Sequence, residues 1–92
     1  MEIKKKEKRE KSMKVGEAVR ERIRGLCAER GITINRLATI SGITQSTLNN
    51  IVGGRNNSAT VATIQKICNG LNLSIIDFFD HELFRHLEQE IE

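Results

Sequence analysis

The sequence predicts an all-α protein, a compact bundle of five short helices followed by an additional short C-terminal helix. Apolar residues recur at helical spacing along most of the chain, no stretch alternates as a strand does, and there is no proline. With 92 residues, of which 38% are hydrophobic, the chain fits one small domain with a single core. No apolar run is long enough to cross a membrane, so no membrane partner is expected.

The first two helices are marked by their ends. We expect the first to begin at Val15 and to end at Gly31, because glycine takes the positive φ of a helix C-terminus without strain. Thr33 then caps the second helix, and Ser41-Gly42 ends it. The residues expected on the apolar faces are Val15, Val19, Ile23, Leu26 and Cys27 in the first helix and Ile34, Leu37 and Ala38 in the second.

Two further helices are predicted in the same way. Thr44 caps a third, short helix that Gly53-Gly54 ends, and residues 54–60 form a polar loop. A fourth helix starts at about Val61, and Asn72 takes the left-handed conformation at its end. The residues expected to face the core are Leu48, Ile51 and Val52 in the third helix and Val61, Ile64, Ile67, Cys68 and Leu71 in the fourth.

The last part of the chain is expected to hold two short helices. Ser74 and Asp77 have the spacing of a capping box that opens a helix through Phe79, with Asp in place of the usual Glu. The apolar face of the final helix is expected to consist of Leu83, Phe84, Leu87 and Ile91. This face either covers the core of the monomer or forms a two-fold dimer contact. We favour the dimer contact, because two copies double the surface available for binding.

The net charge of +3 is unevenly distributed. Residues 1–14 hold seven Lys/Arg and three Glu, and they are expected to form a basic, flexible N-terminal arm. Residues 15–76 carry a charge of +4, whereas residues 77–92 carry −5. The basic arm and body favour a polyanionic partner, with the acidic end facing away from it. A simply solvated surface is the alternative, and the arm is then only a solubilising tail.

Catalytic and metal sites are not expected. Cys27 and Cys68 fall far apart on apolar helix faces, which is typical of reduced, packed thiols in a cytoplasmic protein. His81 and His86 have no cysteine partner, and helix capping explains the nearby carboxylates. Because the sequence offers no nucleophile–base pair, metal-ligand set or phosphate-binding loop, we predict neither an enzyme nor a cofactor.

The most informative stretch covers residues 33–52. There, Ala38, Gly42, Leu48 and Ile51 are spaced A-x3-G-x5-L-x2-I. Two helices that meet steeply at a tight turn need a small residue at their closest approach, a glycine in the turn and apolar anchors on the second helix. This is the helix-turn-helix arrangement, in which the second helix enters the major groove of DNA.

With these residues, the chain resembles the lambda-repressor-like, Cro/repressor-type (XRE-like) family of DNA-binding regulators. The resemblance rests on four motifs in order: G-I-T-x3-L-A-x2-S-G-I-T at 31–44, the Gly-Gly end of the third helix, T-x3-I-x-x-I at 60–67 and L-x-L-S-x2-D-F-F at 71–79. It implies a five-helix bundle whose third helix reads DNA, often as a dimer on a two-fold operator. Residues 15–80 are therefore expected to form the DNA-binding domain, and residues 81–92 an acidic amphipathic C-terminal helix.

The resemblance also implies which residues contact bases. The base-contacting positions of the family match Thr44, Gln45, Ser46, Asn49 and Asn50. Their chemistry agrees, because Gln and Asn can bond adenine N6 and N7 together, and hydroxyls suit several base edges. No charged residue occurs from position 44 to position 52, in a chain that is 29% charged.

Phosphate contacts fix the position of such a protein on DNA without reading its sequence. The resemblance implies them for Thr33, Asn35, Arg36, Thr47, Arg55, Asn56 and Asn57. Two features depart from the family. Ile34 stands where the family commonly has a Gln that contacts phosphate, so this contact is not expected, and Ile34 either packs or lies exposed. The usual proline of the loop after the third helix is also missing.

The sequence therefore predicts a regulator of transcription that binds double-stranded DNA sequence-specifically, as a repressor and a homodimer on a two-fold operator. An alternative from a different class keeps the fold but binds a protein, as an interaction module or an antitoxin-like partner. Specific binding to a duplex favours the first hypothesis. Weak, unspecific DNA binding with a co-purifying partner favours the second.

Overall fold

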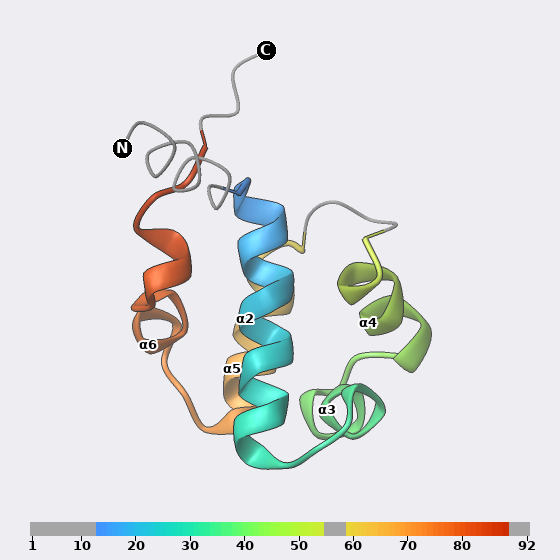
Figure 1. Ribbon diagram of the computed structural model, residues 1–92. Helices are drawn as coiled ribbons and strands as arrows, with labels where there is room; N and C mark the ends of the chain where they lie inside the picture. The colour runs from blue at the N-terminus through green and yellow to red at the C-terminus, as the bar shows by residue number, and fades with distance from the viewer. Residues whose placement is uncertain (1–12, 55–58, 89–92) are drawn as a thin grey trace, which may run out of the picture.

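The structure, a computed structural model, describes residues 13–54 and 59–88. Over these residues the chain is helical, and no β-strand is formed among them, which confirms the predicted all-α class. The elements are α2 (Val15–Arg30), α3 (Ile34–Ser41), α4 (Gln45–Val52), α5 (Val61–Leu71), α6 (Ile75–Phe79) and the 3-10 helix η1 (Glu82–Phe84). In Figure 1, α2 stands at the centre, with α3 and α4 on one side, α6 on the other, and α5 behind it.

Short polar side chains begin four of these helices. The hydroxyls of Thr33, Thr44, Thr60 and Ser74 each accept a hydrogen bond of 2.9–3.1 Å from the backbone N–H three residues later. Each bond satisfies one of the N–H groups that a helix start leaves without an intrahelical partner. The caps predicted at Thr33 and Thr44 are confirmed. At Ser74, the serine half of the expected capping box is present.

The predicted helix ends are confirmed as well. Gly31 and Gly42 have φ angles of 65° and 71°, in the left-handed region that glycine enters without a Cβ penalty. Asn72 takes the same conformation at the end of α5, with a φ of 59°. At the end of α4, by contrast, Gly53 stays right-handed and Gly54 carries the positive φ.

The core lies where the five α-helices face one another. Its largest fully buried side chains are Ile23, Leu26, Leu37, Leu48, Ile67, Cys68 and Phe78. They come from every α-helix of the bundle, so each helix contributes apolar surface to one shared core, and this burial is the main favourable term in folding. Two apolar residues expected on inner faces lie at the surface instead. Val15 is 42% exposed and Val61 is 68% exposed, because each is the first residue of its helix and lies beyond the core.

A close contact between α3 and α5 at Gly70 was not predicted from the sequence. A Cβ atom on this residue would lie 2.6 Å from Ser41 Oγ and 3.0 Å from the carbonyl oxygen of Ile40. The two helices therefore approach each other so closely that only glycine fits between them. Ser41 Oγ is buried there, without a hydrogen-bond partner among the described residues.

The C-terminal segment differs from its prediction. In place of a final α-helix there is the single 3-10 turn of η1, followed by an isolated backbone bridge between Met13 and Leu87. Phe84 packs edge-on against Phe79, with ring centroids 4.9 Å apart. This aromatic contact holds the C-terminal segment against the bundle. Ile91 lies outside the described residues. Phe84 packs against the core of the monomer, and a dimer contact through the rest of this face stays a prediction.

Within the described part of the chain, every helix is too short or too polar to cross a membrane.

Candidate nucleic-acid interface

Helices α3 and α4 form a helix-turn-helix. The backbone N–H of Ile43 donates to the carbonyl of Ala38 at 3.0 Å, which closes the turn around Gly42. Ala38 and Leu48 are fully buried and Ile51 is 4% exposed, so α4 is anchored by its inner face. In the predicted motif, Ala38 is thus the small residue between the helices and Gly42 is the glycine of the turn. Leu48 and Ile51 are the apolar anchors of α4.

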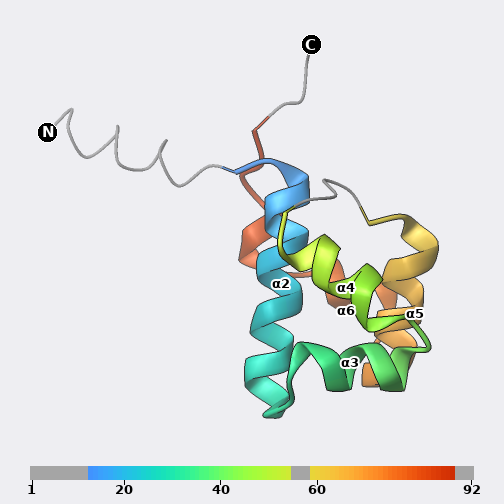
Figure 2. The same cartoon turned by 90° about the vertical axis from the view of Figure 1, so that its right-hand side faces the viewer.

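The outer face of α4 is polar and uncharged. Thr44, Gln45, Ser46 and Asn49 are exposed, and Asn50 is half-buried. Figure 2 shows α4 across the front of the bundle, with no other described helix covering it. The residues expected to contact bases therefore all belong to α4 or its cap, and four of the five are exposed.

One side chain of this face is held by its neighbours. Asn49 Nδ2 donates to Asn35 Oδ1 on α3 at 3.0 Å and to the backbone carbonyl of Gln45 at 2.8 Å. These two bonds tie the outer faces of α3 and α4 together. Nearby, the Thr44 hydroxyl donates to Thr47 Oγ1 at 2.8 Å, so Thr47 supports the cap of α4.

Two comparisons with known proteins relate this geometry to a family. Residues 22–83 match the family described as the Cro/C1-type HTH DNA-binding domain. The chain belongs to this family. It is also similar to the crystal structure of the prophage Lp1 protein 11, with 40% sequence identity and a TM-score of 0.69, over 78% of this chain and 95% of that chain. None of the curated proteins compared with the chain matches it.

The Cro/C1-type match confirms the resemblance inferred from the motifs, and it includes both helices of the helix-turn-helix. A member of this family binds DNA, and its binding surface needs groups for phosphates as well as for bases. At the start of α3, Asn35 and Arg36 are exposed, and Arg36 forms no ion pair within the described residues. Thr33 is exposed too, although its hydroxyl already accepts the capping bond. Arg55, Asn56 and Asn57 lie outside the described residues.

The structure decides between the two alternatives for Ile34, the position where the family commonly has Gln. Ile34 is half-buried and packs against the core. The residue that links α3 to α4 is its neighbour Asn35, through the bond to Asn49. The side-chain bond between the two helices is therefore made one position after Ile34.

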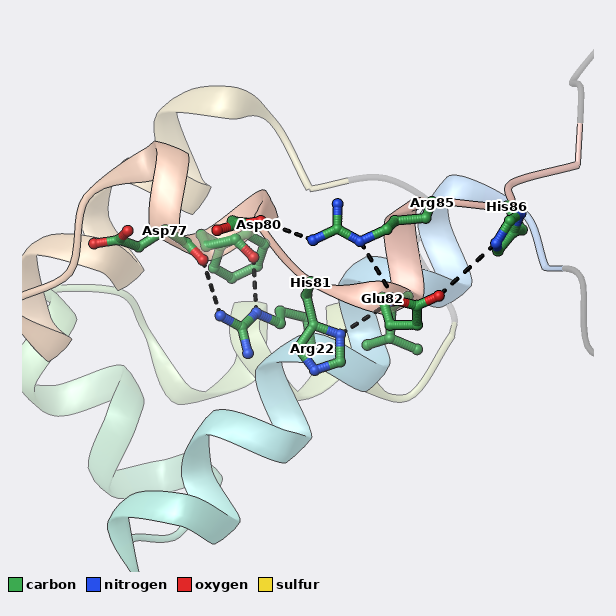
Figure 3. A network of polar contacts seen from close by, with 9 residues as sticks. Arg22, Asp77, Asp80, His81, Glu82, Arg85 and His86 are labelled. Carbon is green, nitrogen blue, oxygen red and sulfur yellow. Dashed lines mark hydrogen bonds and ion pairs between the residues drawn. The ribbon is translucent and has the colours of Figure 1, made fainter.

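The basic residues of α2 have a role that the sequence analysis missed. Arg22 donates to the carbonyls of Phe78 and Asp77 at 2.7 and 2.9 Å, as Figure 3 shows. Arg24 donates to the carbonyl of Val52, and Arg30 donates to that of Leu71 at 2.7 Å. The acceptors lie at the C-terminal ends of α6, α4 and α5, where helices leave carbonyls without partners. Much of the basic body therefore stabilises the fold.

The charged groups after α6 form a separate network. Arg85 bonds to Asp80 at 2.8 Å and lies 3.4 Å from Glu82, which also faces His86 (Figure 3). The hydrogen bond to Asp80 raises the pKa of Arg85 above its usual value. Figure 1 places α6, which precedes this network, on the side of α2 opposite to α3 and α4.

The two thiols are buried and unpaired. Burial raises the pKa of Cys27, and it also raises that of Cys68, where the charge of Arg22 opposes the effect. Both cysteines therefore remain protonated at neutral pH and pack as small apolar residues. Among the described residues, no group of His, Cys, Asp and Glu side chains is arranged to hold a metal ion.

Proposed function

We propose that this Cro/C1-type protein regulates transcription by binding a specific sequence of double-stranded DNA with α4 in the major groove. The observation that carries the proposal is the outer face of α4, which is exposed, polar and uncharged on a helix anchored from within by Leu48 and Ile51. A helix of this kind presents hydrogen-bonding groups to base edges without the unspecific attraction to phosphate that lysine or arginine adds.

The residues of this face suit different contacts. The carboxamides of Gln45 and Asn50 are the candidates for bidentate bonds to adenine, and the hydroxyls of Thr44 and Ser46 suit several base edges. Thr33, Asn35, Arg36 and Thr47 surround this face and are the candidates for phosphate contacts, together with Arg55, Asn56 and Asn57. The protein acts by binding rather than by catalysis.

We further propose that the protein binds as a homodimer and acts as a repressor in the cytoplasm, by occupying its operator. One α4 covers only a half-site, and two copies related by a two-fold axis read half-sites about 34–36 Å apart. Ile76 on α6 is the most exposed of the large apolar side chains in the described residues, at 79%, and is a candidate for a contact between the copies. The buried, unpaired thiols agree with a reducing compartment.

The experiment that tests the proposal is the selection of bound duplexes from a random DNA pool, at near-physiological salt, with sequencing of the recovered DNA. A two-fold symmetric consensus with half-sites about one helical turn apart is the expected result. If no consensus is recovered and binding vanishes as salt rises, only electrostatic attraction remains, and sequence-specific regulation is excluded.

A second candidate function is the binding of a protein partner, as in an antitoxin-like role. The exposed apolar residues Val15, Val61 and Ile76 favour it, and the first two line a hollow of about 580 Å³ between the starts of α2 and α5. Substitution of Val61 by Asp separates the two functions, because it leaves the DNA consensus unchanged and weakens only the binding of a partner.

A further inference from the structure

Asn49 is the one residue of the outer face of α4 whose carboxamide nitrogen is fully occupied within the described structure. A carboxamide nitrogen carries two hydrogens and its oxygen accepts hydrogen bonds. In Asn49, the nitrogen donates to Asn35 Oδ1 at an N···O distance of 3.0 Å and to the carbonyl oxygen of Gln45 at 2.8 Å, and these two bonds together require both hydrogens. Within the described residues, no group donates to the oxygen of Asn49.

The chemistry of the partners fixes the orientation of both carboxamides. A backbone carbonyl accepts hydrogen bonds and never donates them, so the nitrogen of Asn49, and not its oxygen, must face Gln45. That nitrogen is also the donor to Asn35, which must therefore turn its own oxygen inward. Rotation of either carboxamide by 180° would place two acceptors, or two donors, against each other.

We infer that Asn49 reads DNA as a hydrogen-bond acceptor only, and that it selects bases with an amino group, adenine or cytosine, over guanine and thymine. The inference deepens the proposed function and rests on it. In the major groove, adenine N6 and cytosine N4 are donors, whereas guanine and thymine present only acceptors on their edges. An Asn49 oxygen facing guanine O6 or thymine O4 makes no bond. Because its nitrogen is occupied, Asn49 also lacks the donor for N7 that favours adenine over cytosine.

Asn35 is thereby a positioning residue for the side chain of Asn49, and it also has donors that are available for the DNA backbone. Its oxygen holds Asn49, and its Nδ2 donors are not used within the described residues. Asn35 is exposed at the start of α3, where these donors suit a phosphate oxygen. A single side chain thus connects the DNA backbone to the base-reading residue on the neighbouring helix.

The test compares four proteins in the duplex selection: wild type, Asn49→Ala, Asn35→Ala and Asn35→Asp. Wild type is expected to accept adenine and cytosine about equally at one position of each half-site. Asn49→Ala is expected to lose that preference. Asn35→Ala frees one hydrogen of the Asn49 carboxamide, which can then donate to adenine N7. The preference at the same base position is therefore expected to shift to adenine, by roughly tenfold or more over cytosine.

Asn35→Asp is the matched control. It keeps an oxygen for Asn49 and replaces the outward donors by a negative charge. It is therefore expected to bind all duplexes more weakly while keeping the wild-type preference for adenine and cytosine. In the free proteins, the NMR signals of the Asn49 side-chain amide measure the contact directly. They are expected to move in Asn35→Ala and to stay close to wild type in Asn35→Asp.

The outcomes separate the inference from the function beneath it. If wild type selects no consensus, the proposed function is overturned and the inference with it. If wild type selects a consensus but Asn35→Ala leaves every position unchanged, the inference alone is overturned. A wild-type preference for guanine, for thymine or for adenine alone at the position lost in Asn49→Ala also overturns it.

Discussion

Helices α2 and α4 use polar side chains in opposite ways. Three of the four arginines of α2 bond to backbone carbonyls within the bundle, whereas most of the amides and hydroxyls of α4 face outward on a helix without charge. The number of basic residues in a segment is therefore a poor guide to the surface that we propose meets DNA. In this protein α2, the described helix with the most arginines, uses three of them within the fold, and the uncharged helix α4 carries the surface proposed for recognition.

The difference follows from the chemistry of the two kinds of side chain. A guanidinium group has five donors and no acceptor, which suits the carbonyls at a helix C-terminus and the negative end of its dipole. A carboxamide has both donors and acceptors, as base edges do. Substitutions in α2, α3 and α4 test this contrast.

The largest effect is expected where α4 is anchored. Leu48→Ala leaves a cavity at a fully buried position, and we expect the free energy of unfolding to fall by about 2–5 kcal/mol. The measurement is urea denaturation followed by circular dichroism. Ser46→Ala, on the outer face of the same helix, is the control and should change stability by less than about 0.5 kcal/mol. Equal losses in the two variants would contradict the division of α4 into two faces.

The next effect concerns the arginines of α2. Arg22→Ala leaves the carbonyls of Asp77 and Phe78 without their donors, and we expect a loss of about 1–3 kcal/mol in the free energy of unfolding. The selected DNA consensus should stay as in wild type. The control is Arg36→Ala, which removes an exposed arginine of α3. The denaturation midpoint of this variant should match that of wild type. An Arg22→Ala variant that is as stable as wild type but selects an altered consensus would contradict the stabilising role of Arg22 and indicate a DNA contact instead.

Gln45→Ala tests the proposed base contacts of the outer face of α4. Because Gln45 is exposed, the denaturation curve should be unchanged, whereas discrimination at one or two base positions should fall by about 1–3 kcal/mol. Competition binding with duplexes that differ at single positions measures this loss. If affinity dropped equally for every duplex, Gln45 would be a phosphate contact instead.

Arg36→Ala is expected to have the smallest effect, and an unspecific one. The loss of one phosphate contact should weaken binding to all duplexes alike and reduce the slope of log affinity against log salt by about 0.9. Titrations at several salt concentrations provide the slope. An unchanged slope would show that Arg36 does not reach the DNA backbone.

Local chemistry made much of this molecule predictable. Thr44 caps α4 and Gly42 turns the chain because of groups within a few residues of each, and such neighbours are visible in the sequence. The roles of the arginines were not predictable in this way. The carbonyl that Arg22 Nε bonds lies 56 residues away, so only the fold brings the two groups together. The need for glycine at position 70 likewise comes from another helix.

The C-terminal segment shows where the periodicity of apolar residues misleads. The spacing of Leu83, Phe84 and Leu87 suits an α-helix, yet the same residues can also cover the bundle in an irregular conformation. Contacts of Phe84 with the other phenylalanine rings and the backbone bridge at Leu87 favour the second arrangement. The spacing of apolar residues in the sequence also cannot predict which apolar surface is left for contact with a second copy. That surface depends on which side chains the folded monomer has already buried.

The bridge between Met13 and Leu87 has a further consequence for the connectivity of the chain. The N–H of Glu88 donates to the carbonyl of Met13 at 3.0 Å, so the two ends of the described polypeptide meet. A circular permutant can therefore be made by removing residues 1–12 and 89–92, joining Glu88 to Met13 with a short linker and opening new termini elsewhere at the surface. We expect such a permutant to fold with α3 and α4 in their present arrangement. Folding of this permutant would show that the packing of the helices does not depend on their order along the chain.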